Sequence, residues 1–298
     1  MATTATPVDL PTMGAPVIVQ GITGRYGSLH TTLMLQYGTN VAAGVTPGKA
    51  GERVMGVKVY DRVSEAVEKT GARASVLFVP APGLYQAAEE AMTAGIKLVV
   101  VITEHVPIRD ELKLVELARS LGATVVGPNT PGLIVPSRLL KLGIMPATSF
   151  RPGSVALFSR SGTLMYEIAN QLSTSGIGQA VALGVGGDPI NGSTMIEHFE
   201  RVRDWDQVRA VVAVGEIGGD AEEQLAAHIA RTRYPKPVFA YVAGRSAPRE
   251  KRMGHAGAII YGAYGTAESK IAAFRDAGVT VAMTPSEIPR LVASALGK

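Results

Sequence analysis

The sequence predicts an α/β protein of two doubly wound domains, each built on a parallel sheet. Short apolar runs rich in β-branched residues alternate along the whole chain with amphipathic segments, most of which stop at a glycine, as helices commonly do. The apolar runs are hydrophobic at nearly every position, which is typical of strands covered on both faces. A length of 298 residues is sufficient for about two such domains.

Ten apolar runs predict ten strands, five in each half of the chain. Between the halves, the segment "LGIMPATSFRPGS" has two prolines, two glycines and little periodicity, which favours a boundary near residue 149. We therefore expect a flexible extension over residues 1–15, a first domain over 16–149 and a second domain over 150–298. The predicted strands are 16–20, 40–45, 75–80, 97–103, 124–128, 154–159, 179–185, 209–215, 237–244 and 279–283.

The composition excludes several classes of function. The chain has no cysteine, so it has neither disulfides nor a thiolate nucleophile. Its formal net charge is only +4, without the basic block that is typical of nucleic-acid binding. The N-terminus lacks the features of a secretory signal, and the longest apolar stretches are far shorter than the roughly 20 residues of a membrane helix. We expect a cytoplasmic protein that binds neither nucleic acid nor membranes, or a mitochondrial-matrix protein if the source is eukaryotic.

The first predicted strand leads into a glycine loop that is positioned like a phosphate-binding turn. Gly21, Gly24 and Gly27 directly precede a predicted helix, whose N-terminus favours an anion. Their spacing is GxxGxxG, whereas the dinucleotide fingerprint is GxGxxG. A nicotinamide site also needs an acidic residue near the end of the second strand, and this segment instead reads "AAGVTPGKAG", with Lys49. The loop therefore favours NADP or coenzyme A over NAD.

A second polar turn, formed by Ser161, Gly162 and Thr163, lies between strand 154–159 and an amphipathic helix. Two interpretations stay open. Either Ser161 or Thr163 caps the helix, or the turn binds an anion with the unsatisfied N–H groups of the helix N-terminus. The turn has neither the GxxxxGK[ST] pattern of P-loop NTPases nor the GxSxG pattern of the hydrolase elbow, so both classes are excluded.

A glutamate and a histidine follow two further predicted strands. Glu216 comes directly after strand 209–215, and His255 lies in "KRMGHAGAII" after strand 237–244. Because the carboxyl ends of parallel strands meet at one edge of a sheet, we expect the two side chains to lie close together. A carboxylate that holds one imidazole nitrogen fixes the tautomer and leaves the other nitrogen as a nucleophile. No histidines are paired at HxxxH spacing, so we expect no metal site on this chain.

Seven motifs occur in one order along the chain: "TPGKAG", "VITEHVP", "VGPNTPG", "SRSGTLMYE", "GVGGDPING", "GEIGGDAEE" and "APREKRMGHAGAII". Together they resemble the α subunit of succinate–CoA ligase (succinyl-CoA synthetase), an NDP-forming acid–CoA ligase, from about residue 16 to the C-terminus. The resemblance implies a Rossmann-like CoA-binding domain followed by a flavodoxin-like ligase domain.

The resemblance also implies roles for particular residues. His255 matches the histidine that is phosphorylated in the family, and Glu216 matches the glutamate that orients it. Ser161, Gly162 and Thr163 match a helix start that cradles phosphate. The positions that match coenzyme A contacts are Thr23, Gly24, Arg25, Tyr26, Lys49, Ile102, Thr103 and Glu104, and those expected at the acid substrate are Tyr166, Asn129 and Thr130.

The reaction of the family, a step of the tricarboxylic acid cycle, implies partners for this chain. A separate β subunit with an ATP-grasp site binds ATP or GTP with Mg²⁺ and phosphorylates the histidine. The carboxylate substrate takes the phosphoryl group, and the thiol of coenzyme A then displaces phosphate. We therefore expect an αβ or α2β2 assembly in which this chain alone is inactive.

The chain departs from the family pattern near the expected acid site. Thr130 stands where the family usually has cysteine, and Ala147 and Thr148 replace a Gly-His pair. The added hydroxyls suit a hydroxylated acid, so malate, citrate or another dicarboxylate stays an alternative to succinate. Two alternatives come from other classes, namely a non-catalytic CoA-binding regulatory protein and an NADP-linked oxidoreductase. The pair of Glu216 and His255 argues against the first, and the lack of a second dehydrogenase motif argues against the other.

Overall fold

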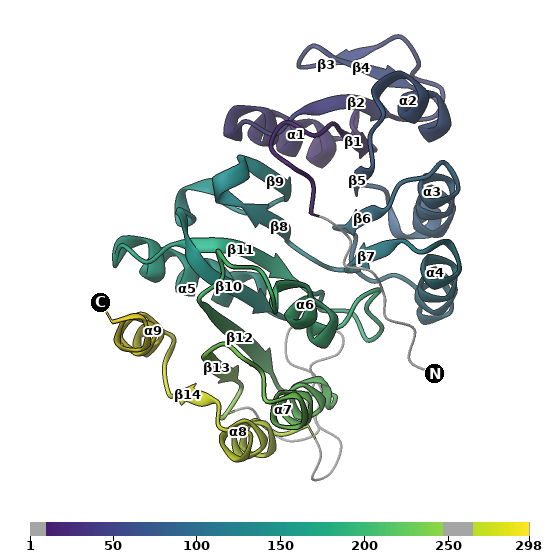
Figure 1. Ribbon diagram of the computed structural model, residues 1–298. Coiled ribbons are helices and arrows are strands. Elements are labelled where there is room, and N and C mark those ends of the chain that lie inside the picture. The colour runs from purple at the N-terminus through teal and green to yellow at the C-terminus, as the bar shows by residue number, and fades with distance from the viewer. Residues whose placement is uncertain (1–9, 247–264, 298) are drawn as a thin grey trace. The chain divides into compact units, whose positions relative to one another are not determined.

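The computed structural model describes residues 10–246 and 265–297, which fold into two α/β units (Figure 1). None of the helices in these described ranges is long and apolar enough to cross a membrane. The first unit comprises Met1–Ile134, Arg138–Met145 and Ile190–Ser193, and the second comprises Val135–Ser137, Pro146–Pro189 and Thr194–Lys298.

The first unit is built on a sheet with the strand order β3-β4-β2-β1-β5-β6-β7. All neighbouring strands are parallel except β3 and β4, which are antiparallel. Without β3, the order is that of the doubly wound dinucleotide-binding fold, which binds ligands at the carboxyl ends of the strands beside β1. The strands are β1 (Val17–Gln20), β2 (Val41–Val45), β3 (Arg53–Val54), β4 (Val57–Tyr60), β5 (Ala74–Leu77), β6 (Leu98–Val101) and β7 (Thr124–Val126).

Helices cover both faces of this sheet. α1 lies on one face, whereas α2, α3 and α4 pack on the other, where their apolar side chains share a core with the strands (Figure 1). Right-handed crossovers explain this division, because the chain leaves β1 toward one edge of the sheet and proceeds from β5 toward the other. As the sequence predicts, α1, α2 and α4 each end at a glycine in the left-handed conformation. The helices are α1 (Arg25–Tyr37), α2 (Val63–Thr70), α3 (Ala81–Thr93) and α4 (Ile108–Leu121).

Two strands after β7, β8 (Gly132–Val135) and β9 (Leu140–Gly143), bring a buried lysine into the first unit. β9 packs against α1, and Lys141 N donates to Thr39 Oγ1 at 2.9 Å. Lys141 is only 1% exposed, and burial lowers the pKa of its ammonium to about 8. Burial, and the neighbouring charge of Lys141, also lower the pKa of His30, whose ring stacks on Phe78 at a centroid distance of 5.6 Å.

The second unit contains a parallel sheet in which its own strands have the order β11-β10-β12-β13-β14. Counted along the chain this is 2-1-3-4-5, the flavodoxin-like order. The prediction of two doubly wound domains is therefore confirmed. The strands are β10 (Pro152–Ser159), β11 (Gln179–Gly184), β12 (Ala210–Glu216), β13 (Val238–Ala243) and β14 (Thr280–Ala282).

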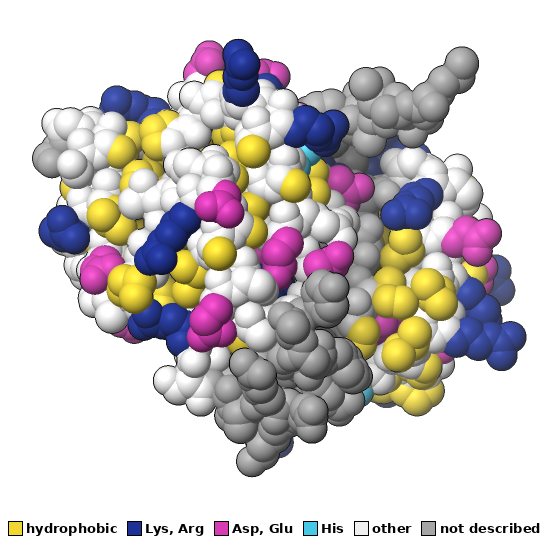
Figure 2. Space-filling model, turned by 90° about the horizontal axis from the view of Figure 1, so that it is seen from below, with side chains coloured by type: hydrophobic (Ala, Val, Ile, Leu, Met, Phe, Trp, Pro, Cys, Tyr) yellow, Lys and Arg dark blue, Asp and Glu magenta, His cyan; other side chains and the backbone are white. Residues whose placement is uncertain are grey.

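Helices cover both faces of this second sheet as well. α5 and α9 pack together on one face, and α6, α7 and α8 form a row on the other (Figure 1). On the surface drawn in Figure 2, Lys and Arg side chains are interspersed with Asp and Glu side chains. The helices are α5 (Gly162–Thr174), α6 (Met195–Val202), α7 (Ala221–Thr232), α8 (Ala267–Asp276) and α9 (Ile288–Leu296), with short 3-10 turns at Pro136–Arg138, Ala147–Ser149 and Pro285–Glu287.

Each of the ten predicted strands overlaps an observed strand, and four observed strands were not predicted: β3, β4, β8 and β9. β3 and β4 form a hairpin at the edge of the first sheet, where Val57 and Val59 are buried and Lys58 is exposed. This two-residue alternation differs from the continuous apolar run that marks a central parallel strand. β8 and β9 are separated by a turn that begins at Pro136, and β9 includes the charged residue Lys141. The sequence of this segment is therefore more typical of a loop than of two strands.

Candidate functional site

The first glycine loop lies between β1 and α1 and depends on close backbone contacts. Gly21 has φ of +74°, and a Cβ at Gly27 would lie 2.1 Å from the carbonyl oxygen of Gly21, so only glycine fits at Gly27. Gly24 is the N-cap of α1, and it provides no side-chain cap. The first N–H groups of α1 therefore stay available at the positive end of the helix dipole, an arrangement that binds phosphate.

Three of the polar residues predicted to contact coenzyme A belong to this loop. Thr23 Oγ1 donates to Thr46 Oγ1 at 3.2 Å, which joins the loop to the end of β2. Arg25 and Tyr26 occupy the first turn of α1, and both are exposed. The loop thus presents a cation and an aromatic ring to solvent next to the open helix N-terminus.

Lys49 adds a second exposed cation after β2. Its turn is held by Asp61 Oδ1, which accepts a hydrogen bond from Lys49 N at 2.9 Å. Lys49 Nζ lies 3.0 Å from Glu52 Oε1, and both side chains are about half exposed. Exposed ion pairs contribute less than about 1 kcal/mol. A ligand phosphate can therefore replace Glu52 as the partner of the Lys49 ammonium at little cost.

Two further predicted segments lie side by side at the carboxyl ends of β6 and β7. Asn129 N donates to the Thr103 carbonyl oxygen at 2.8 Å, and Thr130 N donates to the Val101 carbonyl oxygen at 3.4 Å. Thr103 Oγ1 donates to the Val79 carbonyl oxygen at 2.5 Å. The structure thus brings the predicted coenzyme A segment and the predicted acid-site segment of the first unit together.

The hydroxyl of Thr130 has a structural partner in this loop. It accepts a hydrogen bond from Gly132 N at 2.9 Å, and Thr130 is only 2% exposed. Nearby, Ile102 is partly buried, and a Cβ at Gly143 would lie 3.1 Å from Ile102 Cδ1. Glu104 is exposed. The hydroxyl that distinguishes Thr130 from the cysteine usual in the family therefore helps to hold the loop.

The edge of the first sheet fits coenzyme A as a substrate. The glycine loop packs on the segment after β5, because a Cβ at Gly21 would lie 2.5 Å from the Phe78 carbonyl oxygen. The same segment is bound by Thr103, so the loop and residues 102–104 belong to one continuous edge. An uncapped helix N-terminus with two exposed cations suits phosphate groups, and the edge beyond it suits an extended chain.

In the second unit, the turn between β10 and α5 combines a cap with free helix N–H groups. Ser161 is the N-cap of α5, and its hydroxyl accepts a hydrogen bond from Leu164 N at 3.4 Å. Ser159 Oγ donates to the Ser161 carbonyl oxygen at 2.7 Å and accepts from Ser161 N at 3.0 Å. The N–H groups of Gly162 and Thr163 precede the first intrahelical hydrogen bond and point out of the helix. The capping interpretation is therefore confirmed for Ser161, and anion binding by the N–H groups of Gly162 and Thr163 stays a prediction.

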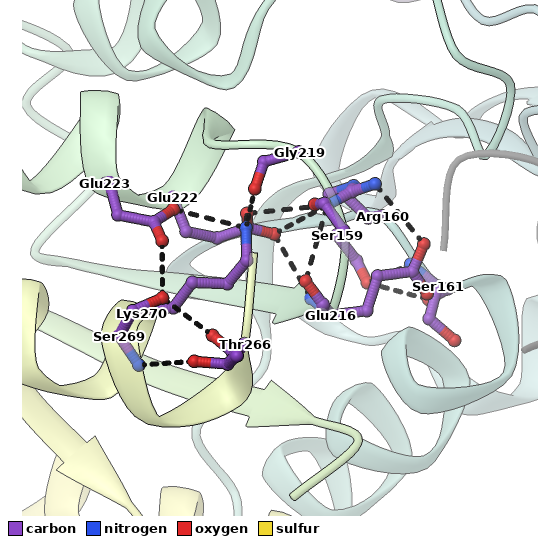
Figure 3. A network of polar contacts seen from close by, with 11 residues as sticks. Ser159, Arg160, Ser161, Glu216, Gly219, Glu222, Glu223, Thr266, Ser269 and Lys270 are labelled. Atoms are coloured by element: carbon purple, nitrogen blue, oxygen red, sulfur yellow. Dashed lines mark hydrogen bonds and ion pairs between the residues drawn. The ribbon is translucent and has the colours of Figure 1, made fainter. Parts of the chain in front are cut away.

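Glu216 ends β12 and is buried beside Arg160 (Figure 3). Glu216 is 8% exposed, and Arg160 Nη2 lies 3.7 Å from Glu216 Oε1, which is an ion pair but longer than a direct hydrogen bond. Arg160 Nη1 also donates to the Glu216 carbonyl oxygen at 3.4 Å. Because Arg160 directly precedes Ser161, this contact places Glu216 beside the N-terminus of α5.

A second carboxylate, that of Glu222, is buried and binds both the backbone of Glu216 and the side chain of Arg160 (Figure 3). Glu222 is 1% exposed and accepts hydrogen bonds from Glu216 N at 3.1 Å, from Arg160 Nη1 at 3.1 Å and from the ammonium of Lys270. Lys270 is fully buried, and its Nζ lies 3.2 Å from Glu223 Oε2. In this group, two cations face three carboxylates.

The charges of this group stabilise one another. Burial alone would raise the pKa of Glu222, but the charges of Arg160 and Lys270 outweigh burial and lower it. Burial likewise opposes the charge of Arg160, but Glu222 and then Glu216 outweigh it, so the pKa of the guanidinium is raised. Arg160 and Glu222 therefore stay ionised over the physiological pH range.

The segment that carries His255 is anchored at both ends to the turn after β12. At its start, a Cβ at Gly244 would lie 2.6 Å from Ile217 Cγ2, so the two residues are in close contact. At its end, Gly218 N donates to the Gly265 carbonyl oxygen at 2.8 Å. His255 itself lies outside the described residues, and its proximity to the turn stays a prediction.

Tyr166, the residue of the second unit expected at the acid substrate, lies on α5 one turn beyond the helix start. Its ring meets Phe150 edge to face at a centroid distance of 6.4 Å. Burial raises the pKa of the Tyr166 phenol to about 12. The hydroxyl therefore stays protonated at physiological pH and can donate a hydrogen bond to a carboxylate.

Sequence reasoning assigned no role to Arg160, Glu222 or Lys270, although two of them break a visible pattern. Glu222 occupies the buried face of α7 together with Leu225, Ala226 and Ile229. Lys270 occupies the buried face of α8 together with Ala267, Ile271 and Phe274. Charged residues at core positions of two neighbouring helices indicate a buried ion pair, because a lone buried charge is costly.

Comparisons with known proteins agree with this organisation. The model of the CoA binding domain matches residues 14–105, and the model of the CoA-ligase matches residues 158–280. The fold and these matches define the chain as a subunit of an acid–CoA ligase. It is 53% identical over 280 residues to the α subunit 2 of ADP-forming succinate–CoA ligase from Archaeoglobus fulgidus, which covers 94% of this chain and 96% of that protein. The corresponding α subunit from Methanothermobacter thermautotrophicus is 50% identical, over 94% of each chain. The chain belongs to the family of succinate–CoA ligase α subunits.

Solved structures extend the similarity to larger enzymes. ATP citrate lyase from Methanosaeta concilii, in complex with (3S)-citryl-CoA, aligns with a TM-score of 0.88 and 25% identity. The alignment covers 97% of this chain and 50% of the lyase, so this chain spans about half the length of that enzyme. The dinucleotide-forming acetyl-coenzyme A synthetase 1 of Ca. Korarchaeum cryptofilum aligns over 91% of this chain with a TM-score of 0.71 and 22% identity, and it shares the fold.

Proposed function

We propose that this chain is the α subunit of an ADP-forming ligase that joins succinate to coenzyme A, with His255 as the carrier of the phosphoryl group. The observation that carries the proposal is the contact between Arg160 and Glu216. It joins the turn that anchors the His255 segment to the helix N-terminus that suits phosphate. This contact supports the proposal that a nucleophile, the carboxylate that orients it and an anion site share one edge of the second sheet.

In the first step, one imidazole nitrogen of His255 attacks the γ-phosphorus of ATP. A nitrogen–phosphorus bond forms, the bond to the bridging oxygen breaks, and ADP leaves. Glu216 accepts a hydrogen bond from the other ring nitrogen and stabilises the positive charge that develops on the ring. The N–H groups of Gly162 and Thr163 stabilise the phosphoryl oxygens.

In the second step, a carboxylate oxygen of the acid attacks the phosphorus, and the bond to His255 breaks, which gives an acyl phosphate and a neutral imidazole. In the third step, the thiol sulfur of coenzyme A attacks the acyl carbon, the bond to phosphate breaks and the thiol proton is released. Tyr166 binds the acid as a hydrogen-bond donor. The α1 N-terminus, Arg25 and Lys49 bind the phosphates of coenzyme A.

The names of the relatives support a partner subunit, since they are α subunits of a ligase. We infer a β subunit with an ATP-grasp site that binds the nucleotide with Mg²⁺, in an αβ or α2β2 assembly. The phosphates of the nucleotide hold part of the magnesium coordination sphere. GTP is the alternative nucleotide.

Succinate is favoured over a hydroxylated acid by two observations. The relatives that are about 50% identical over nearly their whole length are succinate–CoA ligase subunits. The hydroxyl of Thr130 accepts a hydrogen bond from Gly132 N, and Thr130 is buried, so this hydroxyl already has a structural role in its own loop. Citrate and malate remain in the test, because ATP citrate lyase shares the fold at 25% identity.

The test is transfer of a labelled phosphoryl group. The chain and its partner subunit, expressed together, are incubated with γ-labelled ATP and magnesium. We expect acid-labile label on this chain, its loss in His255→Asn, and its discharge by succinate plus coenzyme A but not by citrate or malate. Discharge by citrate or malate, but not by succinate, would show that citrate or malate is the acid substrate in place of succinate. A chain that binds coenzyme A but is never labelled with an active partner is a regulatory protein instead.

A further inference from the structure

The carboxylate predicted to orient the histidine is supported by a second layer of charged groups in the second unit. Arg160 lies between two carboxylates and contacts them unequally. Its Nη1 is 3.1 Å from Glu222 Oε1 and 3.4 Å from Oε2, whereas its Nη2 is 3.7 Å from Glu216 Oε1. The shorter and doubled contact is the stronger one. Glu222 therefore determines where the guanidinium lies, and the guanidinium in turn faces Glu216.

Glu222 also holds the backbone of Glu216 directly. The N–H of Glu216 donates to Glu222 Oε1 at 3.1 Å, at the last residue of β12. One carboxylate thus fixes both the main chain at Glu216 and the cation beside the Glu216 side chain. A Cβ at Gly215 would lie 2.6 Å from Glu222 Cγ, so the strand end packs closely on this side chain.

Arg160 fixes the turn beyond Glu216 as well. Its Nη1 donates to the Gly218 carbonyl oxygen at 2.9 Å, and Gly218 N donates to Gly265 at 2.8 Å. Lys270 Nζ donates to the Gly219 carbonyl oxygen at 3.1 Å. The turn that anchors the His255 segment is therefore bound by both buried cations of the group.

We propose that Arg160 and Glu222 are positioning residues for Glu216, which fix its backbone and its charged neighbour so that it selects a single tautomer of His255. This inference rests on the proposed phosphorylation of His255. Neither residue touches the transferred phosphoryl group in this scheme. Glu222 acts through Arg160 and through the Glu216 N–H, and Lys270 keeps Glu222 ionised.

The test compares variants of the full chain, co-expressed with its partner subunit, in the rate of histidine labelling by ATP. Arg160→Met and Glu222→Gln should slow labelling by about 100-fold, the cost of a misplaced catalytic group. Arg160→Lys keeps a positive charge but cannot place separate nitrogens against Glu222 and Glu216, so labelling should stay within about tenfold of the wild type. Glu223→Gln is the matched control, since Glu223 binds Lys270 and Ser269, and its labelling should stay within about threefold of the wild type.

A spectroscopic readout separates positioning from a loss of folding. In ¹⁵N-histidine-labelled full chain, with the His255 signals assigned by their loss in His255→Asn, the wild type and Glu223→Gln should show one dominant tautomer. Arg160→Met and Glu222→Gln should show a mixture of the two. If Glu222→Gln does not fold, the double variant Glu222→Gln with Lys270→Met removes the carboxylate and one cation together and should show the same mixture.

The outcomes distinguish this inference from the function on which it rests. No label on the wild type with an active partner contradicts the proposed function. A different outcome overturns only the positioning role: the wild type is labelled normally, Arg160→Met and the double variant are labelled as fast as Glu223→Gln, and both show one dominant tautomer of His255. In that case the proposed function stands.

Discussion

The backbone N–H of Glu216 donates a hydrogen bond to the carboxylate of Glu222, so two acidic residues lie side by side at the end of β12. This arrangement depends on Arg160 and Lys270, which both bind Glu222 in the interior. Without these cations, burial would favour a neutral Glu222. The charges of this site therefore depend on one another. The changes in stability caused by substituting its residues should not add up.

Lys270→Met should destabilise the chain strongly, because it removes one cation from a buried carboxylate. We expect a loss of about 3–5 kcal/mol in the free energy of unfolding, typical of a broken buried ion pair. Urea denaturation followed by circular dichroism measures the change. The double variant Lys270→Met with Glu222→Gln should lose less than the sum of the single variants. Additive losses would show that the two side chains do not interact.

Lys141 should make stability depend on pH. Burial lowers its pKa from 10.5 to about 8, so the unfolded chain binds more protons between these values. Stability should therefore rise as the pH increases through this interval, by about 3 kcal/mol at 1.36 kcal/mol per pKa unit. In Lys141→Met this increase of stability with pH should disappear, and the variant should be more stable than the wild type near pH 7. Urea denaturation of both proteins at pH 7.5 and 10.5 tests this, and parallel pH profiles would contradict it.

Ser161→Ala should separate capping from phosphate binding. The substitution removes the cap on Leu164 N and should cost about 1 kcal/mol of stability, whereas Ser161→Gly should cost only a few tenths. Because the phosphoryl group is assigned to the N–H groups of Gly162 and Thr163, histidine labelling should change by less than about threefold in both variants. A loss of labelling with intact stability would assign the Ser161 hydroxyl to phosphate instead.

Two glycines of the first loop should differ in their tolerance of alanine. At Gly27 the added methyl group would lie 2.1 Å from a backbone oxygen, so the loop must shift. At Gly24 the corresponding distance is 3.3 Å, and φ of −69° is accessible to alanine. We expect Gly27→Ala to weaken coenzyme A binding at least tenfold, about 1.4 kcal/mol, and Gly24→Ala to weaken it less. Isothermal titration with coenzyme A measures both, and equal affinities would contradict the assignment of the loop.

Tyr166→Phe should affect the acid more than the other substrates. Its phenol has a pKa of about 12 and stays a hydrogen-bond donor across the working pH range. Loss of one such hydrogen bond, about 1–1.5 kcal/mol, should raise KM for the acid by about tenfold. KM values for coenzyme A and nucleotide serve as internal controls. Equal changes in all three would indicate a general structural effect rather than contact with the acid.

The helices, the central strands and the doubly wound class follow from features that single segments display. The continuous apolar runs that form β1 and β12 and the glycines at helix ends reflect local burial and local backbone conformation, so the sequence alone predicts them. The edge strands β3 and β4 escaped prediction because one side of β4 is exposed at Lys58. The buried group around Glu222 on α7 escaped it because the partners of Glu222 come from the turn after β10, from β12 and from α8, which only the fold brings together.

In the proposed mechanism, the two anchors of the His255 segment limit how far a phosphoryl group on His255 can travel. His255 is 10 residues from Gly265 and 11 from Gly244, the two ends that are fixed at the same turn. Even a fully extended chain of 10 residues spans no more than about 36 Å. The proposed mechanism therefore requires the nucleotide on the partner subunit to bind within about that distance of the anchor plus the length of the histidine side chain, or else the subunits move relative to each other during each catalytic cycle.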